Sequence, residues 1–121
     1  MAMFECGINS NLGEWQDISG QIVFQNTWDS GSSTKVYKNK NMCFATFIFQ
    51  NGKNPSSVNE IFVSGLPHPK TDVMGVAWIT TEAGIFVKTS LFNITSDGKL
   101  KCNQPLDFKN TLYASVMYAI Q

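Results

Sequence analysis

Short apolar runs separated by turn residues recur along the whole chain. The runs are rich in Phe, Val, Ile, Thr and Tyr, and no window shows the sustained i, i+3, i+4, i+7 apolar spacing of an amphipathic helix. This pattern predicts an all-β fold, either an antiparallel β-sandwich or a jelly-roll-like barrel. The predicted strands cover residues 21–28, 35–37, 42–50, 58–65, 73–81, 85–90, 91–95, 99–103 and 111–120.

The chain length and the N-terminal residues predict the domain organisation. At 121 residues the chain has the size of one domain. Residues 20–121 are predicted to form this domain, and residues 1–19 an N-terminal arm or the end of a shaft or linker, with Trp15 packing where the domain begins. Residues 1–10 contain Glu5 and lack a basic stretch followed by an apolar run, so we expect no signal peptide there.

One hairpin can be predicted in register. A three-residue loop at residues 96–98 sets Ile94 opposite Leu100, whereas a two-residue turn would set Ile94 opposite Lys101. The longer loop pairs apolar residues with each other, so we predict that loop, with Gly98 in the left-handed conformation.

A similar hairpin is predicted around residues 82–84. Its loop places Ile79 across from Val87. Trp78 lies in the middle of the strand before this loop, beside Val76 and Ala77, and is predicted to belong to the core.

Two strands are apolar on both faces, although an ordinary half-exposed strand alternates apolar with polar residues. In the run 42–50, one face holds Cys43, Ala45, Phe47 and Phe49, and the other holds Met42, Phe44, Thr46 and Ile48. The run 111–120 behaves similarly, with Tyr113, Ser115, Met117 and Ala119 opposite an apolar face. The second faces need cover, either from a loop or arm of a closed barrel or from another subunit. We favour a subunit interface.

Composition and charge narrow the classes of function. Charged residues make up 15% of the chain, against an average of about 25%. The nine basic residues are all Lys and are balanced by nine Asp and Glu, so no basic field would attract phosphate groups. Arg, the residue best suited to bidentate phosphate and guanine contacts, is absent. We therefore expect no nucleic-acid binding. No run of about 18 apolar residues is present, so we also expect no membrane insertion.

Catalytic and metal-binding motifs are missing. Cys6, Cys43 and Cys102 are far apart and odd in number, which fits neither a disulfide framework nor a zinc site, and we expect free thiols in a reducing cytoplasm. The single histidine, His68, has Asp72 as a neighbour that could orient it, but no serine occupies a nucleophile elbow. The sequence predicts neither an enzyme nor a cofactor.

Three loops are candidate ligand-binding surfaces, and one of them covers residues 51–57. Trp28, Asp29 and Ser30 combine an aromatic plate with hydrogen-bonding groups, which suits the apolar C–H faces and the hydroxyls of a sugar. Alternatively, Trp28 ends a strand and caps the core. His68 and Asp72 lie in a second candidate loop and complete the set of predicted binding residues.

Several motifs follow one another in a recognisable order along the chain. Trp15 and Gly20 lead into a first strand, a long apolar strand follows at residues 43–49, and a Leu-Pro-x-Pro corner lies at residues 66–69. An Asp-Gly hairpin at Asp97 and a closing strand with aromatic residues complete the order. This order resembles that of the C-terminal head domains of bacteriophage tail-fibre and baseplate receptor-binding proteins. The commoner form has Gly-Tyr-Arg-Pro after the Leu-Pro, whereas here Pro69 is followed by Lys70.

The resemblance implies a homotrimeric, non-catalytic β-domain in the virion tail that attaches to a saccharide or protein on the bacterial surface and contacts other tail proteins. A trimer would account for the two-sided apolar strands. The alternatives are a structural tail or baseplate module without receptor binding, a small carbohydrate-processing enzyme and a monomeric carbohydrate-binding module.

Overall fold

A computed structural model describes residues 13–27, 33–53 and 55–121, and it confirms the all-β class. The strands are β1 (Gln16–Asp17), β2 (Val23–Phe24), β3 (Lys35–Lys38), β4 (Met42–Gln50), β5 (Glu60–Ser64), β6 (Val73–Thr80), β7 (Phe86–Ile94), β8 (Leu100–Cys102) and β9 (Thr111–Ala119), and a 3₁₀ turn, η1, spans Ser19–Gln21. They form one nine-stranded antiparallel sheet in the order β1-β3-β4-β9-β6-β7-β8-β5-β2.

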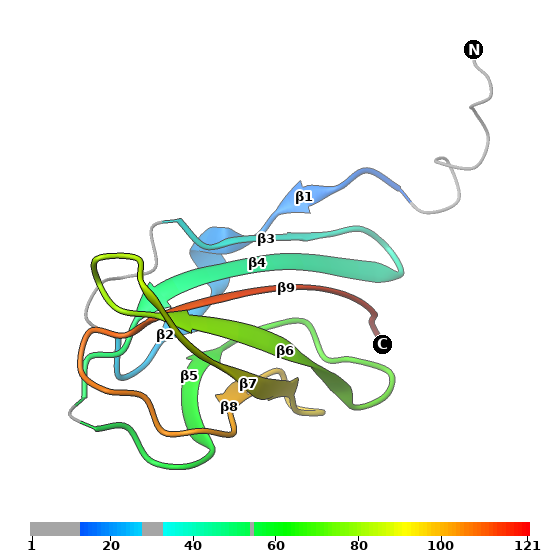
Figure 1. The fold of residues 1–121 in the computed structure, drawn as a ribbon. Helices are drawn as coiled ribbons and strands as arrows, with labels where there is room; N and C mark the ends of the chain where they lie inside the picture. The colour runs from blue at the N-terminus through cyan, green and yellow to red at the C-terminus, as the bar shows by residue number, and fades with distance from the viewer. Residues whose placement is uncertain (1–12, 28–32, 54) are drawn as a thin grey trace.

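The sheet is curled, so that its two edge strands are neighbours in sequence. β1 pairs with β3 at one edge and β2 pairs with β5 at the other, and only residues 18–22 connect β1 to β2. Ile18 and Ile22 are both buried, so this connection contributes to the interior where the edges approach. Figure 1 shows β3, β4 and β9 side by side, with β5 and β8 on the other side of β6 and β7. Pairing with the sheet therefore begins at Gln16, within the segment predicted to be an arm or linker.

The hairpin between β7 and β8 has the predicted register. Ile94 pairs with Leu100 and Phe92 with Cys102. Gly98 has φ +77°, and a Cβ at this position would lie 2.1 Å from the carbonyl oxygen of Leu66. Glycine is therefore required here both for the left-handed turn and for the close approach of the segment that follows β5.

The β6–β7 hairpin differs from the prediction in two ways. β7 is one continuous strand, where two strands were predicted at residues 85–90 and 91–95. Ile79 pairs with Lys88 and Thr80 with Phe86, so Val87 is an extra residue in a bulge and does not face Ile79. The bulge shifts the register by one residue, which alternation alone cannot reveal.

The core lies on the inner face of the curled sheet. Cys43, Ala45, Phe47 and Phe49 of β4 are buried there, as the alternation predicted. Phe62 of β5 packs against Phe49, with their ring centroids 5.3 Å apart. The other fully buried large side chains are Phe92, Leu66, Ile79, Ile94, Leu100, Leu106, Leu112, Val36 and Val63. They come from almost every strand, so a single core holds the described part of the chain together.

Candidate functional site

The outer face of the sheet is apolar and exposed over four adjacent strands, β4, β9, β6 and β7. The strand register places Phe44 opposite Met117 and Trp78 opposite Tyr113. It also places Val76 of β6 opposite Leu91 of β7. Trp78 is 59% exposed and Met117 57% exposed. We refer to these seven side chains as the outer patch: Phe44, Met74, Val76, Trp78, Leu91, Tyr113 and Met117.

No charged side chain interrupts the outer patch on these four strands. The outward positions that lie between its members hold Met42, Thr46 and Ile48 of β4, Ser115 and Ala119 of β9, and Thr89 and Asn93 of β7. A protein partner could therefore cover this face without burying an unpaired charge, whose cost would be several kcal/mol.

The outer patch is large for a monomer. With roughly 200 Å² as the full accessible area of a large side chain, the exposed fractions correspond to roughly 700 Å² of apolar surface. The largest apolar patch on a typical monomer covers about 300–600 Å². Trp78 was predicted to be core and is not, because the interior of β6 is filled by Ala77 and Ile79, and the sheet has only one interior face.

The outer patch ends in a hollow on one side and in a projecting hairpin on the other. The hollow has a volume of about 350 Å³ and is lined by Trp15, Tyr37, Phe44 and Met117. Trp15 therefore contacts the outer face where the domain begins. On the far side, the tip of the β6–β7 hairpin exposes Ile85, Phe86 and Val87 in succession.

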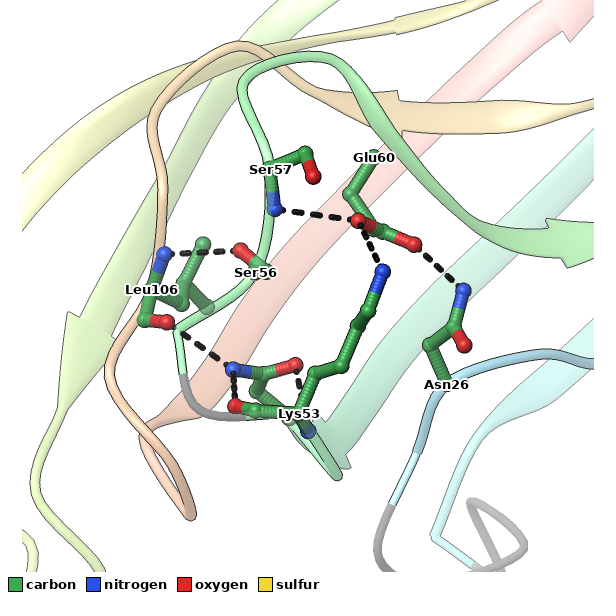
Figure 2. Close-up of polar contacts among 7 residues, drawn as sticks. Asn26, Lys53, Ser56, Ser57, Glu60 and Leu106 are labelled. Atoms are coloured by element: carbon green, nitrogen blue, oxygen red, sulfur yellow. Dashed lines mark hydrogen bonds and ion pairs between the residues drawn. The ribbon is translucent and has the colours of Figure 1, made fainter.

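A second candidate site lies at one end of the sheet, where a network of polar contacts centres on Glu60. The Glu60 carboxylate accepts hydrogen bonds from Asn26 Nδ2 and from the backbone N–H of Ser57, the latter at 3.0 Å. The Lys53 ammonium lies 3.4 Å from the same carboxylate. Figure 2 shows how Glu60 joins Asn26, Lys53 and Ser57. The Glu60 side chain is only 9% exposed, so these donors replace the water that it loses.

Buried Asn51 and Ser56 connect this network to the loop before β9. Asn51 Nδ2 donates to the carbonyl oxygens of Lys53, Leu106 and Asp107 at 2.6, 2.9 and 3.1 Å. Ser56 Oγ accepts a hydrogen bond from the backbone N–H of Leu106 at 2.8 Å. The loops 51–59 and 103–110 are therefore held together by side chains that a sequence search for catalytic motifs does not select.

The end of the sheet around Glu60 also contains all three non-glycine residues with positive φ among the described residues, Asn26, Asn59 and Lys109. Asn tolerates the left-handed region, but Lys rarely adopts it. Such conformations cost of order 1–3 kcal/mol and accumulate at functional sites. We call residues 25–27, 51–53, 55–60 and 103–110 the loop end.

The structure describes two of the five predicted binding residues, His68 and Asp72. Trp28, Asp29 and Ser30 lie outside the described residues; Thr27, just before them, forms a β-bridge with Asn51 at the loop end. His68 and Asp72 are exposed at the opposite end of β4, where Pro69 bridges Ile120 and the N–H of Gln121 donates to the His68 carbonyl oxygen. The orientation of His68 by Asp72 stays a prediction.

A few titratable groups among the described residues have a shifted pKa. Cys43 and Cys102 are buried free thiols, and burial raises the pKa of Cys43. Hydrogen bonds from Ser19 and Thr95 lower the pKa of Asp17 and Asp97, both at exposed turns. In the described ranges, no three His, Cys, Asp or Glu side chains cluster to hold a metal ion. Within those same ranges, no helix has the length and apolarity needed to cross a membrane.

Comparison with known proteins adds no relative. No protein-family model, no curated protein and no solved structure matches the chain.

Proposed function

We propose that this chain is a non-catalytic recognition domain that assembles as a homotrimer through its outer patch and binds a saccharide or protein on a bacterial surface, as a bacteriophage tail-fibre or baseplate head does. The exposed, uncharged outer patch carries this proposal. It is larger than a monomer normally leaves in water, and its lack of charge suits contact with another protein surface. The order of motifs in the sequence supports the virion setting.

The loop end supports the attachment role. Its backbone is held by Glu60 and Asn51, while Asn26, Lys53, Ser57 and Phe108 are exposed. Amide, hydroxyl and ammonium groups near an aromatic ring are the groups that recognise sugar hydroxyls and C–H faces.

The mass of the domain in solution tests the assembly. Light scattering after size exclusion should give about three times the 13.4 kDa of one chain. The variant Trp78→Lys/Met117→Lys should be monomeric, because it places two charges in the outer patch. Ser96→Lys, which adds a charge at an exposed turn outside the patch, should keep the parental mass. A monomeric parent chain would remove the basis of the proposal.

Surface binding tests the attachment role. The labelled trimer should bind to whole bacteria or to a glycan array, and Trp28→Ala should weaken this binding by roughly tenfold or more, equivalent to about 1.4 kcal/mol. His68→Ala, at the opposite end of the domain, is the matched control. If only His68→Ala weakens binding, the receptor site lies at the other end. A trimer that binds no surface would instead be a structural virion module.

A monomeric carbohydrate-binding module is the second candidate, and the aromatic side chains of the outer face favour it. Trp15, Tyr37, Tyr113 and Trp78 could stack against sugar rings. However, sugar sites combine such rings with polar groups that fix the hydroxyls, and the outer patch has only scattered Ser and Thr side chains between its members. Glycan binding by a monomeric chain that is lost in Trp78→Ala would favour this second function.

A further inference from the structure

We propose that the subunits contact one another by seating the β6–β7 hairpin tip of one copy in the hollow of the next. The tip consists of Ile85, Phe86 and Val87, and the hollow is lined by Trp15, Tyr37, Phe44 and Met117. This inference rests on the proposed self-association and specifies which parts of the outer face meet.

The tip is an apolar projection with a preformed backbone. Its three side chains are 67%, 55% and 43% exposed, in chain order. The hairpin loop is held by the Thr81 N–H donating to the Ile85 carbonyl oxygen at 2.8 Å and by the Gly84 N–H donating to the Thr81 carbonyl oxygen at 2.9 Å. The Phe86 ring packs edge-on against Trp78, with ring centroids 5.7 Å apart. Since these residues are already ordered, docking them costs little conformational entropy.

The hollow is a matching apolar receptor. Tyr37, Phe44 and Met117 follow one another across β3, β4 and β9, because Tyr37 pairs with Phe44 and Phe44 with Met117. Trp15, just before β1, completes the lining. All four side chains present carbon or sulfur surface, and at about 350 Å³ the hollow is large enough to receive apolar side chains of the tip.

Position and area favour a second copy of this chain as the occupant. The tip and the hollow lie at different places on one outer face, so neither can fill the other within one chain, and a heterologous contact of this kind forms a ring when the rotation between copies closes. The outer patch, the tip and Trp15 together expose roughly 1,100 Å² of apolar side chain. When this area is divided equally between two neighbouring copies, each contact covers roughly 550 Å² of apolar surface on one copy. A stable interface buries about 800 Å² per partner, of which about 56–65% is apolar.

Disulfide trapping between two differently labelled copies tests the contact. Ile85→Cys and Tyr37→Cys are made in separate chains, each in a Cys6→Ser background, so that the remaining native thiols, Cys43 and Cys102, are buried. After mixing, subunit exchange and mild oxidation, the tip variant should cross-link to the hollow variant, and neither should cross-link to itself. Ser96→Cys replaces Tyr37→Cys in the control mixture and should give no product with Ile85→Cys.

The outcomes separate this inference from the proposed function. A tip-to-hollow product supports the contact. An oligomeric parent chain whose mixture gives no such product, or gives only tip-to-tip product, overturns the contact and leaves self-association standing. A monomeric parent chain overturns both. Met117→Lys in the hollow and Phe86→Lys at the tip provide a second measurement: each should reduce the trimer fraction at least tenfold, because each would bury a charge at the contact.

Discussion

The two faces of β4 and β9 are both apolar but differ in how far they are buried. On the inner face Phe47, Phe49 and Leu112 are fully buried, whereas on the outer face Phe44 and Met117 are 36% and 57% exposed. Both faces come from the same strands and follow one another residue by residue. Hydrophobicity therefore identified the residues that favour burial, but the curl of the sheet left room for only one of the two faces inside a single chain.

The inner and the outer face therefore contribute to stability in two different ways. The inner face contributes to the stability of each domain at any concentration. The outer face can be covered only by another molecule, so its contribution depends on how much partner is present. Substitutions on the two faces should consequently have different signatures.

The largest expected effect is on the inner face. Phe47→Ala should lower the free energy of unfolding by about 3–5 kcal/mol, because it removes a fully buried ring from the core. Phe44→Ala, the same substitution on the outer face, should lower it by a smaller amount when both are made in the monomeric Trp78→Lys/Met117→Lys background, because the Phe44 side chain is already 36% exposed. Urea denaturation measures both values. Equal losses at the two positions would show that the outer face is packed within one chain.

The smallest expected effect is a dependence of stability on pH that comes from the inner face. Burial raises the pKa of Cys43 above its ordinary value of 9.0, and burial also raises the pKa of Tyr118, whose hydroxyl donates to the Pro67 carbonyl oxygen. Below pH 9.0 the Cys43 proton is bound in both the folded and the unfolded chain, so its contribution is complete. As the pH rises further the unfolded chain releases this proton first, and stability is lost.

This loss should be less than about 1.4 kcal/mol per pH unit, the limit for one proton. Denaturation series between neutral pH and pH 10 measure it, and Cys43→Ala should flatten the slope. The control is Cys102→Ala, which removes the other buried thiol of the core. A slope that Cys43→Ala leaves unchanged would mean that this thiol ionises as freely in the folded chain as in the unfolded chain.

Local rules anticipated a large part of the fold. The register between β7 and β8 follows from Ile94, Leu100 and the need for a left-handed Gly98, all within a few residues. The β6–β7 register was missed because a bulge at Val87 depends on the strand twist and on packing, which alternation does not encode. Trp78 was misplaced for a related reason, since a tryptophan in the middle of a strand is equally consistent with either face of the sheet.

The candidate site was less accessible to sequence reasoning. The predicted loop around His68 lies at the end of the sheet away from Asn51, a separation that depends on which strands pair. Glu60 and Asn51 carry no recognisable motif, and their importance appears only when residues 26, 53, 57 and 106 are brought together. The three consecutive apolar residues after the turn at Gly84 are visible in the sequence, but their exposure is not.

The sequence by itself determined that this protein is all-β and that β4 and β9 are apolar on both faces, because periodicity is a local property of the chain. Only the tertiary structure decided which face became the core, where Trp78 points and which loops meet around Glu60. These depend on the order in which the strands pair and on the curl of the sheet, and both are set by contacts between residues far apart in the chain.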